Sequence, residues 1–130
     1  MQSPIYAVGD IHGQLRELDR VLNLIEADGG RDAHVVFLGD YADRGPDSRG
    51  VLDRLIAGQT AEHNWTFLMG NHDRMFRMFM QSPPQSDPYM MVELYWLHER
   101  LGGNTTLASY GVDASGTRRE KDVQADALAA

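Results

Sequence analysis

Three short apolar runs in this chain each end in a glycine that is followed within a few positions by side chains able to bind metal ions or transfer protons. The runs end at Gly9, Gly39 and Gly70. Carboxylate oxygens and imidazole nitrogens suit Mn²⁺, Fe²⁺ and Zn²⁺, and an imidazole can also serve as a general acid or base. The side chains that follow the three glycines are Asp10, His12, Asp40, Asp43, Arg44, Asn71 and His72.

The apolar runs themselves have the features of buried strands, and the segments between them those of amphipathic helices. Residues 4–9, 35–38 and 65–69 are short, apolar and bounded by glycine. Over 15–25 and 51–56, apolar residues recur at three- and four-residue steps, which predicts two helices. Strands that alternate with helices form right-handed β-α-β units and a parallel sheet. Because parallel strand ends meet at one edge, the three junctions are predicted to form one metal site.

The spacing within the first junction suggests how a cation would be held. Side chains two positions apart in an extended chain point the same way, so Asp10 and His12 are expected to bind one ion together if strand geometry continues through Ile11. Asp40 can add a third ligand and bridge to a second ion, to which Asn71 would offer an amide oxygen. A single Gly-Asp or Asn-His pair would indicate only a turn, but three such junctions together favour a site.

Composition and length indicate one compact domain. The chain has 130 residues, of which 42% are hydrophobic, and its formal charge of −7 argues against a surface that coats nucleic acid or an anionic membrane. There are no cysteines, so a metal must take oxygen and imidazole ligands. The start has no basic leader and no run of about 18 apolar residues occurs, so we expect a cytoplasmic protein.

Beyond the third junction the alternation of strands and helices stops. The pattern predicts a helix over 75–80, a break at 82–84 and another helix over 90–101, together forming a cover whose methionines pack in the core. Residues 113–130 are polar and then alanine-rich, which is typical of a frayed helix or a disordered end. We therefore divide the chain into a domain portion at 1–112 and an end segment at 113–130.

The three junctions resemble the N-terminal signatures of a known family. Gly-Asp-Ile-His-Gly (9–13), Gly-Asp-Tyr-Ala-Asp-Arg-Gly (39–45) and Gly-Asn-His-Asp (70–73) look like those of the calcineurin-like metallophosphoesterases, in the branch of the phosphoprotein phosphatases and bacterial serine/threonine phosphatases. Order, spacing and strand context match over about residues 4–111. The resemblance implies an α/β fold, the β-α-β-α-β first half of a two-sheet sandwich flanked by helices.

The resemblance also implies a site for two divalent metal ions. Asp10, His12 and Asp40 would bind the first ion, and Asp40 would bridge to the second, which Asn71 would also bind. Manganese is the expected metal, with iron and zinc as alternatives. The second half of the family's fold normally adds further histidines, so we expect this chain to be an N-terminal portion that binds at most one ion tightly.

The remaining residues of the signatures acquire catalytic roles from the same resemblance. His72 looks like the general acid, Asp43 matches the carboxylate that orients its imidazole, and Arg44 matches an arginine that grips phosphate. The histidines elsewhere are not expected to ligate metal: His34 and His63 lie far from the strand ends, and His98 falls in a presumed helix.

The predicted function is that of a metal-dependent hydrolase, a serine/threonine phosphatase in which water attacks phosphorus directly, with weak turnover in this chain alone. Its partner would be a phosphoprotein or small phosphoester, with no nucleic acid and no membrane. One alternative is a dinucleoside polyphosphate hydrolase, although Tyr41 and Asp43 favour the protein phosphatases. Another is a non-catalytic metal-binding or interaction module. Half of a sandwich would also expose apolar surface, which predicts self-association.

Overall fold

The computed structural model describes residues 3–81, 83–90 and 94–130 and has a mixed α/β fold. Its sheet has three parallel strands in the order β1-β2-β3. The strands are in register at their carboxyl ends, where Val8 pairs with Phe37 and Phe37 with Phe67. The strands and the first two helices are β1 (Ile5–Val8), α1 (Leu15–Gly29), β2 (His34–Phe37), α2 (Ser48–Thr60) and β3 (Trp65–Phe67).

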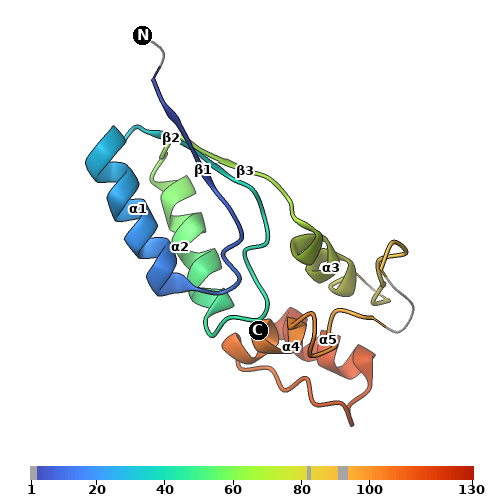
Figure 1. The fold of residues 1–130 in the computed structure, drawn as a ribbon. Helices are drawn as coiled ribbons and strands as arrows, with labels where there is room; N and C mark the ends of the chain where they lie inside the picture. The colour runs from blue at the N-terminus through green and yellow to red at the C-terminus, as the bar shows by residue number, and fades with distance from the viewer. Residues whose placement is uncertain (1–2, 82, 91–93) are drawn as a thin grey trace.

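Helices α1 and α2 cover one face of this sheet (Figure 1). Alternate strand residues point towards them, as expected for a period of two. Asp47 caps α2, because its side chain accepts a hydrogen bond from the Gly50 amide at 2.8 Å. The buried core between the helices and the sheet comprises Ile11, Leu18, Leu22, Val35, Phe37, Tyr41, Val51 and Leu55.

Three further helices gather beyond the carboxyl ends of the strands (Figure 1). They are α3 (Asn71–Phe79), α4 (Gly103–Ser109) and α5 (Glu120–Ala129). A second buried cluster holds them together, formed by Met75, Phe79, Trp96, Leu101, Leu107, Val112 and Val123. The edge of the sheet where the three junctions lie is therefore flanked by a separately packed group of helices.

The β-α-β-α-β order predicted from the sequence is confirmed, but the helix predicted over 90–101 is wrong. Residues 91–93 and Ser82 lie outside the described residues, and residues 94–101 form turns rather than a helix. The carbonyl of His98 accepts bonds from the amides of both Leu101 and Gly102. Gly102 then takes a left-handed conformation with φ of 86°, and α4, which the sequence pattern did not predict, begins after it. The division at residue 112 remains a prediction, and the end segment contains α5.

Large apolar side chains on the first strand and directly after the second and third strands are exposed. Ile5 is 65% exposed, Leu38 49%, Leu68 48% and Met69 56%. Exposed apolar patches are typical of interaction surfaces. We call these four residues the open face and expect them to drive self-association of the chain.

Replacing Ile5 and Leu68 with threonine should weaken this self-association at least several-fold, because both apolar side chains become polar while strand propensity is kept. Static light scattering over a concentration series measures the effect. Leu24→Thr, which is equally exposed but lies on α1, serves as the control. A wild-type chain that stays monomeric at all concentrations would contradict the expectation.

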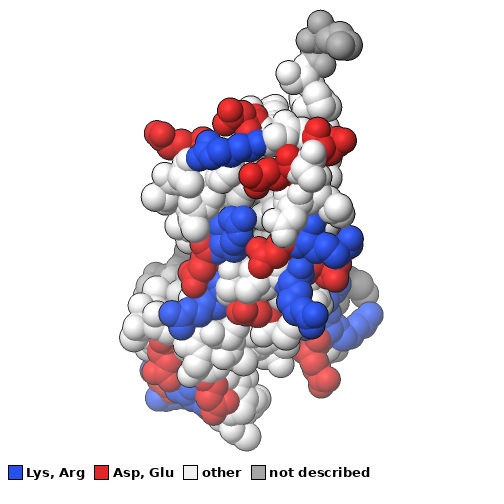
Figure 2. Space-filling view, turned by 90° about the vertical axis from the view of Figure 1, so that its left-hand side faces the viewer, with Lys and Arg blue, Asp and Glu red and all other residues white. Residues whose placement is uncertain are grey.

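Among the residues that the structure describes, no helix combines the length and apolar character needed to cross a bilayer. Figure 2 shows the side of the molecule on which α1 lies, and there basic and acidic side chains are interspersed. Neither sign of charge gathers into one continuous patch on this face.

Candidate metal centre

The structure brings Asp10, His12 and Asp40 together at the carboxyl edge of the sheet. We call these three candidate ligands the metal cluster. One ligand atom from each side chain lies within 4.8 Å of the other two. His12 Nε2 and Asp10 Oδ2 are 3.7 Å apart. Metal–ligand bonds of roughly 2.1 Å place two donors on one ion at most about 4.2 Å apart, so this pair already fits an ion. The Asp10 side chain is 67% exposed, so a small rotation of it can shorten its distance to the other ligand atoms to the value that one ion requires.

The route by which Asp10 and His12 converge differs from the prediction. Strand β1 ends at Val8, and His12 has a left-handed φ of 45°, so extended geometry does not continue through Ile11. Instead the amides of Ile11 and His12 both donate to the Asp40 carbonyl, at 3.0 and 2.9 Å. A turn anchored on the second junction therefore presents the two side chains.

A hydrogen bond fixes the tautomer of His12. Its Nδ1 lies 2.8 Å from the Ala42 carbonyl oxygen. A carbonyl can only accept, so Nδ1 carries the proton and Nε2 presents its lone pair on the side of Asp10. This is the arrangement that a neutral imidazole needs to bind a metal.

Four residues of the site other than glycine adopt left-handed backbone conformations. The φ values are 45° at His12, 56° at Asp40, 75° at Asp43 and 70° at Arg44. Such conformations cost on the order of 1–3 kcal/mol each and persist only where surrounding contacts enforce them. All four residues were predicted for the site, two as metal ligands and two in catalytic roles, and their shared backbone conformation supports a functional constraint on this part of the chain.

Asp73 links the second and third junctions. Its Oδ2 accepts bonds from the amides of Asp40 and Gly70, at 2.7 and 2.9 Å, and its Oδ1 from the amide of Tyr41 at 3.0 Å. Burial raises the pKa of Asp73 above its usual range, against the lowering effect of these three amides. The Tyr41 hydroxyl donates to the Leu68 carbonyl at 2.6 Å, and burial raises its pKa to about 12.

Asn71 and Arg44, the predicted second-ion ligand and phosphate-binding residue, are both exposed. Asn71 is the first residue of α3, and the amide of the next residue, His72, donates to Asp40 Oδ1 at 3.0 Å. Arg44 Nη2 donates to the Arg100 carbonyl at 3.3 Å. Asn71 thus adjoins Asp40 through the neighbouring His72 amide, Arg44 contacts the segment before α4, and the predicted roles of both residues stay predictions.

His72 and Asp43 form a buried pair next to the metal cluster. His72 Nδ1 lies 2.8 Å from Asp43 Oδ2, and the two side chains are 5% and 0% exposed. The rings of His72 and His12 meet edge to face, with centroids 4.7 Å apart. The predicted acid and its predicted partner therefore stand in contact, beside the predicted metal ligands.

Two further residues, which the sequence analysis did not single out, donate hydrogen bonds to the Asp43 carboxylate. Trp96 Nε1 donates to Asp43 Oδ2 at 2.8 Å, and Thr106 Oγ1 donates to Asp43 Oδ1 at 2.6 Å. Trp96 fell inside the wrongly predicted helix. Thr106 lies within the part of the chain, residues 4–111, that was matched to the family, but no signature residue indicated a role for it.

The other three histidines make contacts of a different kind. His34 Nε2 lies 3.1 Å from the Thr66 hydroxyl, and His63 stacks on Trp65. His98 is in a turn, and its Nδ1 accepts a bond from the Arg100 amide.

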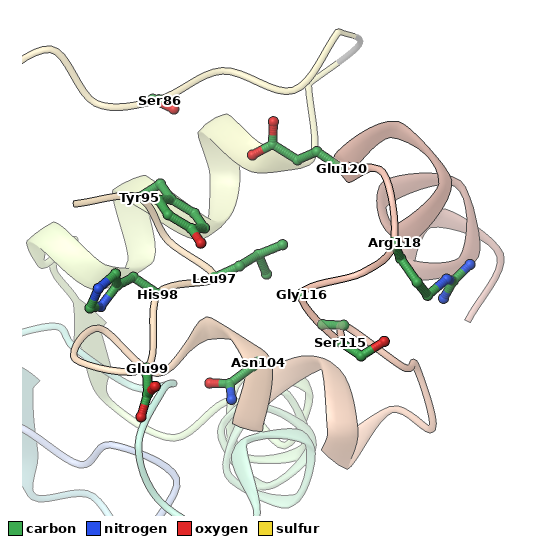
Figure 3. A pocket seen from close by; sticks show the side chains of 11 residues that line it. Ser86, Tyr95, Leu97, His98, Glu99, Asn104, Ser115, Gly116, Arg118 and Glu120 are labelled. Carbon is green, nitrogen blue, oxygen red and sulfur yellow. The ribbon is translucent and has the colours of Figure 1, made fainter. Parts of the chain in front are cut away.

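A cavity of about 730 Å³ lies elsewhere in the described part of the chain. Figure 3 shows that His98, Asn104 and Arg118 line it, together with Tyr95, Glu99 and Glu120. None of the predicted site residues lines this cavity. The metal cluster instead sits on an open part of the surface.

The chain has an α/β fold with a parallel sheet, and carboxylate and imidazole side chains gather at the carboxyl edge of that sheet. This combination is typical of one class of metal-binding domain. The sequence profile of the calcineurin-like phosphoesterases matches residues 3–125, and the chain belongs to this family. A relative in Caenorhabditis elegans, named "Putative serine/threonine-protein phosphatase C06A1.3", is 37% identical over 75 residues. The match covers 55% of this chain and 20% of that protein, so the matched part of the chain spans about a fifth of the length of this relative.

Proposed function

We propose that this chain carries the first metal-binding half of a phosphoester hydrolase that acts on phosphoserine or phosphothreonine in proteins. The proposal rests on one observation, that candidate metal ligands lie next to a histidine paired with a carboxylate. The metal cluster of Asp10, His12 and Asp40 lies beside the Asp43–His72 pair, with the His12 and His72 rings 4.7 Å apart. Family membership and the named phosphatase among the relatives support the same reading.

The residues of the pair suit general-acid catalysis. Asp43 accepts the Nδ1–H of His72, so in the imidazolium form, which carries two protons, the one that can be transferred is on Nε2. As water oxygen bonds to phosphorus, the bond to the leaving oxygen breaks and that oxygen takes the Nε2 proton. When bound, divalent ions supply an activated water and neutralise charge on the phosphoryl oxygens, and manganese is the ion we propose.

Arg44 would bind the phosphate group. It is exposed, and its guanidinium makes one bond of 3.3 Å, to the carbonyl of Arg100. Carbonyl contacts leave the remaining N–H groups of a guanidinium fork available to phosphate oxygens. Asn71, at the start of α3, would offer its amide oxygen to a second ion bridged by Asp40.

Hydrolysis of dinucleoside polyphosphates is the second candidate. The buried Asp43, 0% exposed and bonded to His72, favours the protein phosphatases, because the polyphosphate hydrolases tend to lack an acidic residue at that position. A non-catalytic binding module is the third candidate, because within this chain only Asp40 and the neutral Asn71 are assigned to a second ion.

A direct assay separates the three candidates. With Mn²⁺ present, the chain should hydrolyse a phosphoserine peptide, followed by phosphate release, faster than diadenosine tetraphosphate, followed by the appearance of mononucleotides. Asp10→Asn should lower this rate at least about 100-fold, roughly 3 kcal/mol in activation free energy, by removing a charged ligand. Asp32→Asn, with a 93% exposed side chain, is the matched control.

The other outcomes of this assay support the second or the third candidate. A preference for the dinucleotide would support the second candidate. Mn²⁺ binding without phosphate release above the Asp10→Asn background would support the binding module and contradict the proposed activity.

A further inference from the structure

We propose that Trp96 and Thr106 are positioning residues that hold Asp43, and through it the His72 ring, in the orientation needed for proton transfer. This inference rests on the proposed function. It gives a role to the C-terminal part of the chain, which contains none of the three signatures. Trp96 comes from the turns before α4 and Thr106 from α4 itself.

The hydrogen bonds around the Asp43 carboxylate occupy both of its oxygens. Oδ2 accepts from His72 Nδ1 and from Trp96 Nε1, both at 2.8 Å, while Oδ1 accepts from the Thr106 hydroxyl at 2.6 Å. An indole N–H can only donate, so the oxygen that it contacts is an acceptor. His72 must therefore place its own proton on Nδ1, and its Nε2 is left to face the reacting group.

These four side chains are shielded from water. Exposure is 0% for Asp43 and Thr106, 4% for His72 and 5% for Trp96. A buried carboxylate needs partners for its lone pairs, and here water does not supply them. The two added donors hold the Asp43 carboxylate in one rotamer.

Thr106 also holds the backbone of Asp43. The Asp43 amide donates to Thr106 Oγ1 at 2.8 Å, while the same hydroxyl donates to Asp43 Oδ1. The Ser48 hydroxyl, 3.1 Å from that amide, is a second acceptor. These hydrogen bonds hold both the backbone and the side chain of Asp43. They help to keep the residue in its left-handed conformation, with φ of 75°.

The second hydrophobic cluster fixes the direction of the Trp96 N–H. The indole stacks on Phe76 with an interplanar angle of 11° and a centroid distance of 4.8 Å, and it packs on Phe79 at 5.0 Å. A Cβ added at Gly103 would lie 2.5 Å from the indole Cδ2, so the chain passes directly against the ring. Packing among α3, α4 and the intervening turns is thereby coupled to the geometry of the pair.

The test uses substitutions that remove single hydrogen bonds. Trp96→Phe keeps an aromatic ring on Phe76 and removes the N–H. Thr106→Val removes the hydroxyl at nearly constant shape, and Thr106→Ser restores it. Trp65→Phe alters a tryptophan that packs against β2 and makes no bond to Asp43, so it is the matched control.

The first readout compares two substrates in Mn²⁺-loaded chain. With a phosphoserine peptide, whose alkoxide needs a proton, kcat should fall about 10-fold in Trp96→Phe and Thr106→Val while KM changes less than about twofold. With p-nitrophenyl phosphate, whose leaving group departs unprotonated, kcat should fall less than about twofold. Mn²⁺ affinity should stay within about twofold. Equal losses with both substrates would overturn the proposal.

The second readout does not need activity. Long-range ¹H–¹⁵N spectra of metal-free chain at one fixed pH report which nitrogen of His72 carries the proton. Wild-type, Trp65→Phe and Thr106→Ser chains should show a single Nδ1–H form, and Trp96→Phe and Thr106→Val a mixture of tautomers. An unchanged tautomer in both of these variants would overturn the proposal. If no substrate is hydrolysed, the proposed function fails and this readout alone decides the positioning role.

Discussion

His12→Gln should lower the affinity of the chain for Mn²⁺ by about 100-fold, which corresponds to about 2.7 kcal/mol of binding free energy. The Nε2 atom of His12 lies 3.7 Å from Asp10 Oδ2, and the bond from Nδ1 to the Ala42 carbonyl holds its lone pair towards the cluster. A glutamine cannot keep that anchor and also present a nitrogen lone pair, because its amide nitrogen only donates. Isothermal titration calorimetry measures the change.

The control for this substitution is His34→Gln, which changes a histidine on the sheet that is bonded to Thr66 and lies outside the cluster. Its affinity for Mn²⁺ should match that of the wild-type chain. Equal affinity in His12→Gln and wild type would mean that the ion binds elsewhere.

Asp73→Ala should destabilise the fold by about 3 kcal/mol, because three partly buried amides lose their acceptor at once. These amides belong to Asp40, Tyr41 and Gly70, so the loss also loosens the connection between the second and third junctions. Burial already raises the pKa of Asp73. The hydrogen bonds, rather than the charge, are therefore the source of the stabilisation.

Urea unfolding followed by circular dichroism measures this loss. Asp32→Ala removes a carboxylate whose side chain is 93% exposed, and it should change the free energy of unfolding by less than about 0.5 kcal/mol. A similar small change in Asp73→Ala would refute the structural role of this carboxylate.

The convergence of the three junctions could be predicted from local sequence. Each strand is short and apolar and ends at a glycine, and parallel strands place their carboxyl ends at one edge. The details of the convergence could not be predicted. The side chains of Asp10 and His12 meet through a left-handed turn bonded to the Asp40 carbonyl, and such a conformation leaves no periodic trace in the sequence.

The contacts that Trp96 and Thr106 make with Asp43 could not be predicted from the sequence either. The apolar spacing over 90–101 fits a helix, but the described residues 94–101 form turns, because an aromatic cluster and a buried carboxylate determine where the indole lies. Thr106 contacts a residue 63 positions earlier in the chain. Only the tertiary structure brings such distant donors to one carboxylate, and local patterns carry no information about it.

One metal ion should bind to Asp10, His12 and Asp40. Adding Mn²⁺ to ¹⁵N-labelled chain in steps up to one equivalent and recording amide spectra locates the ion, because its unpaired electrons broaden nearby resonances. We expect selective loss of signals from residues 9–13, 39–43 and 70–73, complete near one ion per chain. Broadening spread over residues 113–130, or signals from the three segments that persist at one equivalent, would show that the ion binds elsewhere.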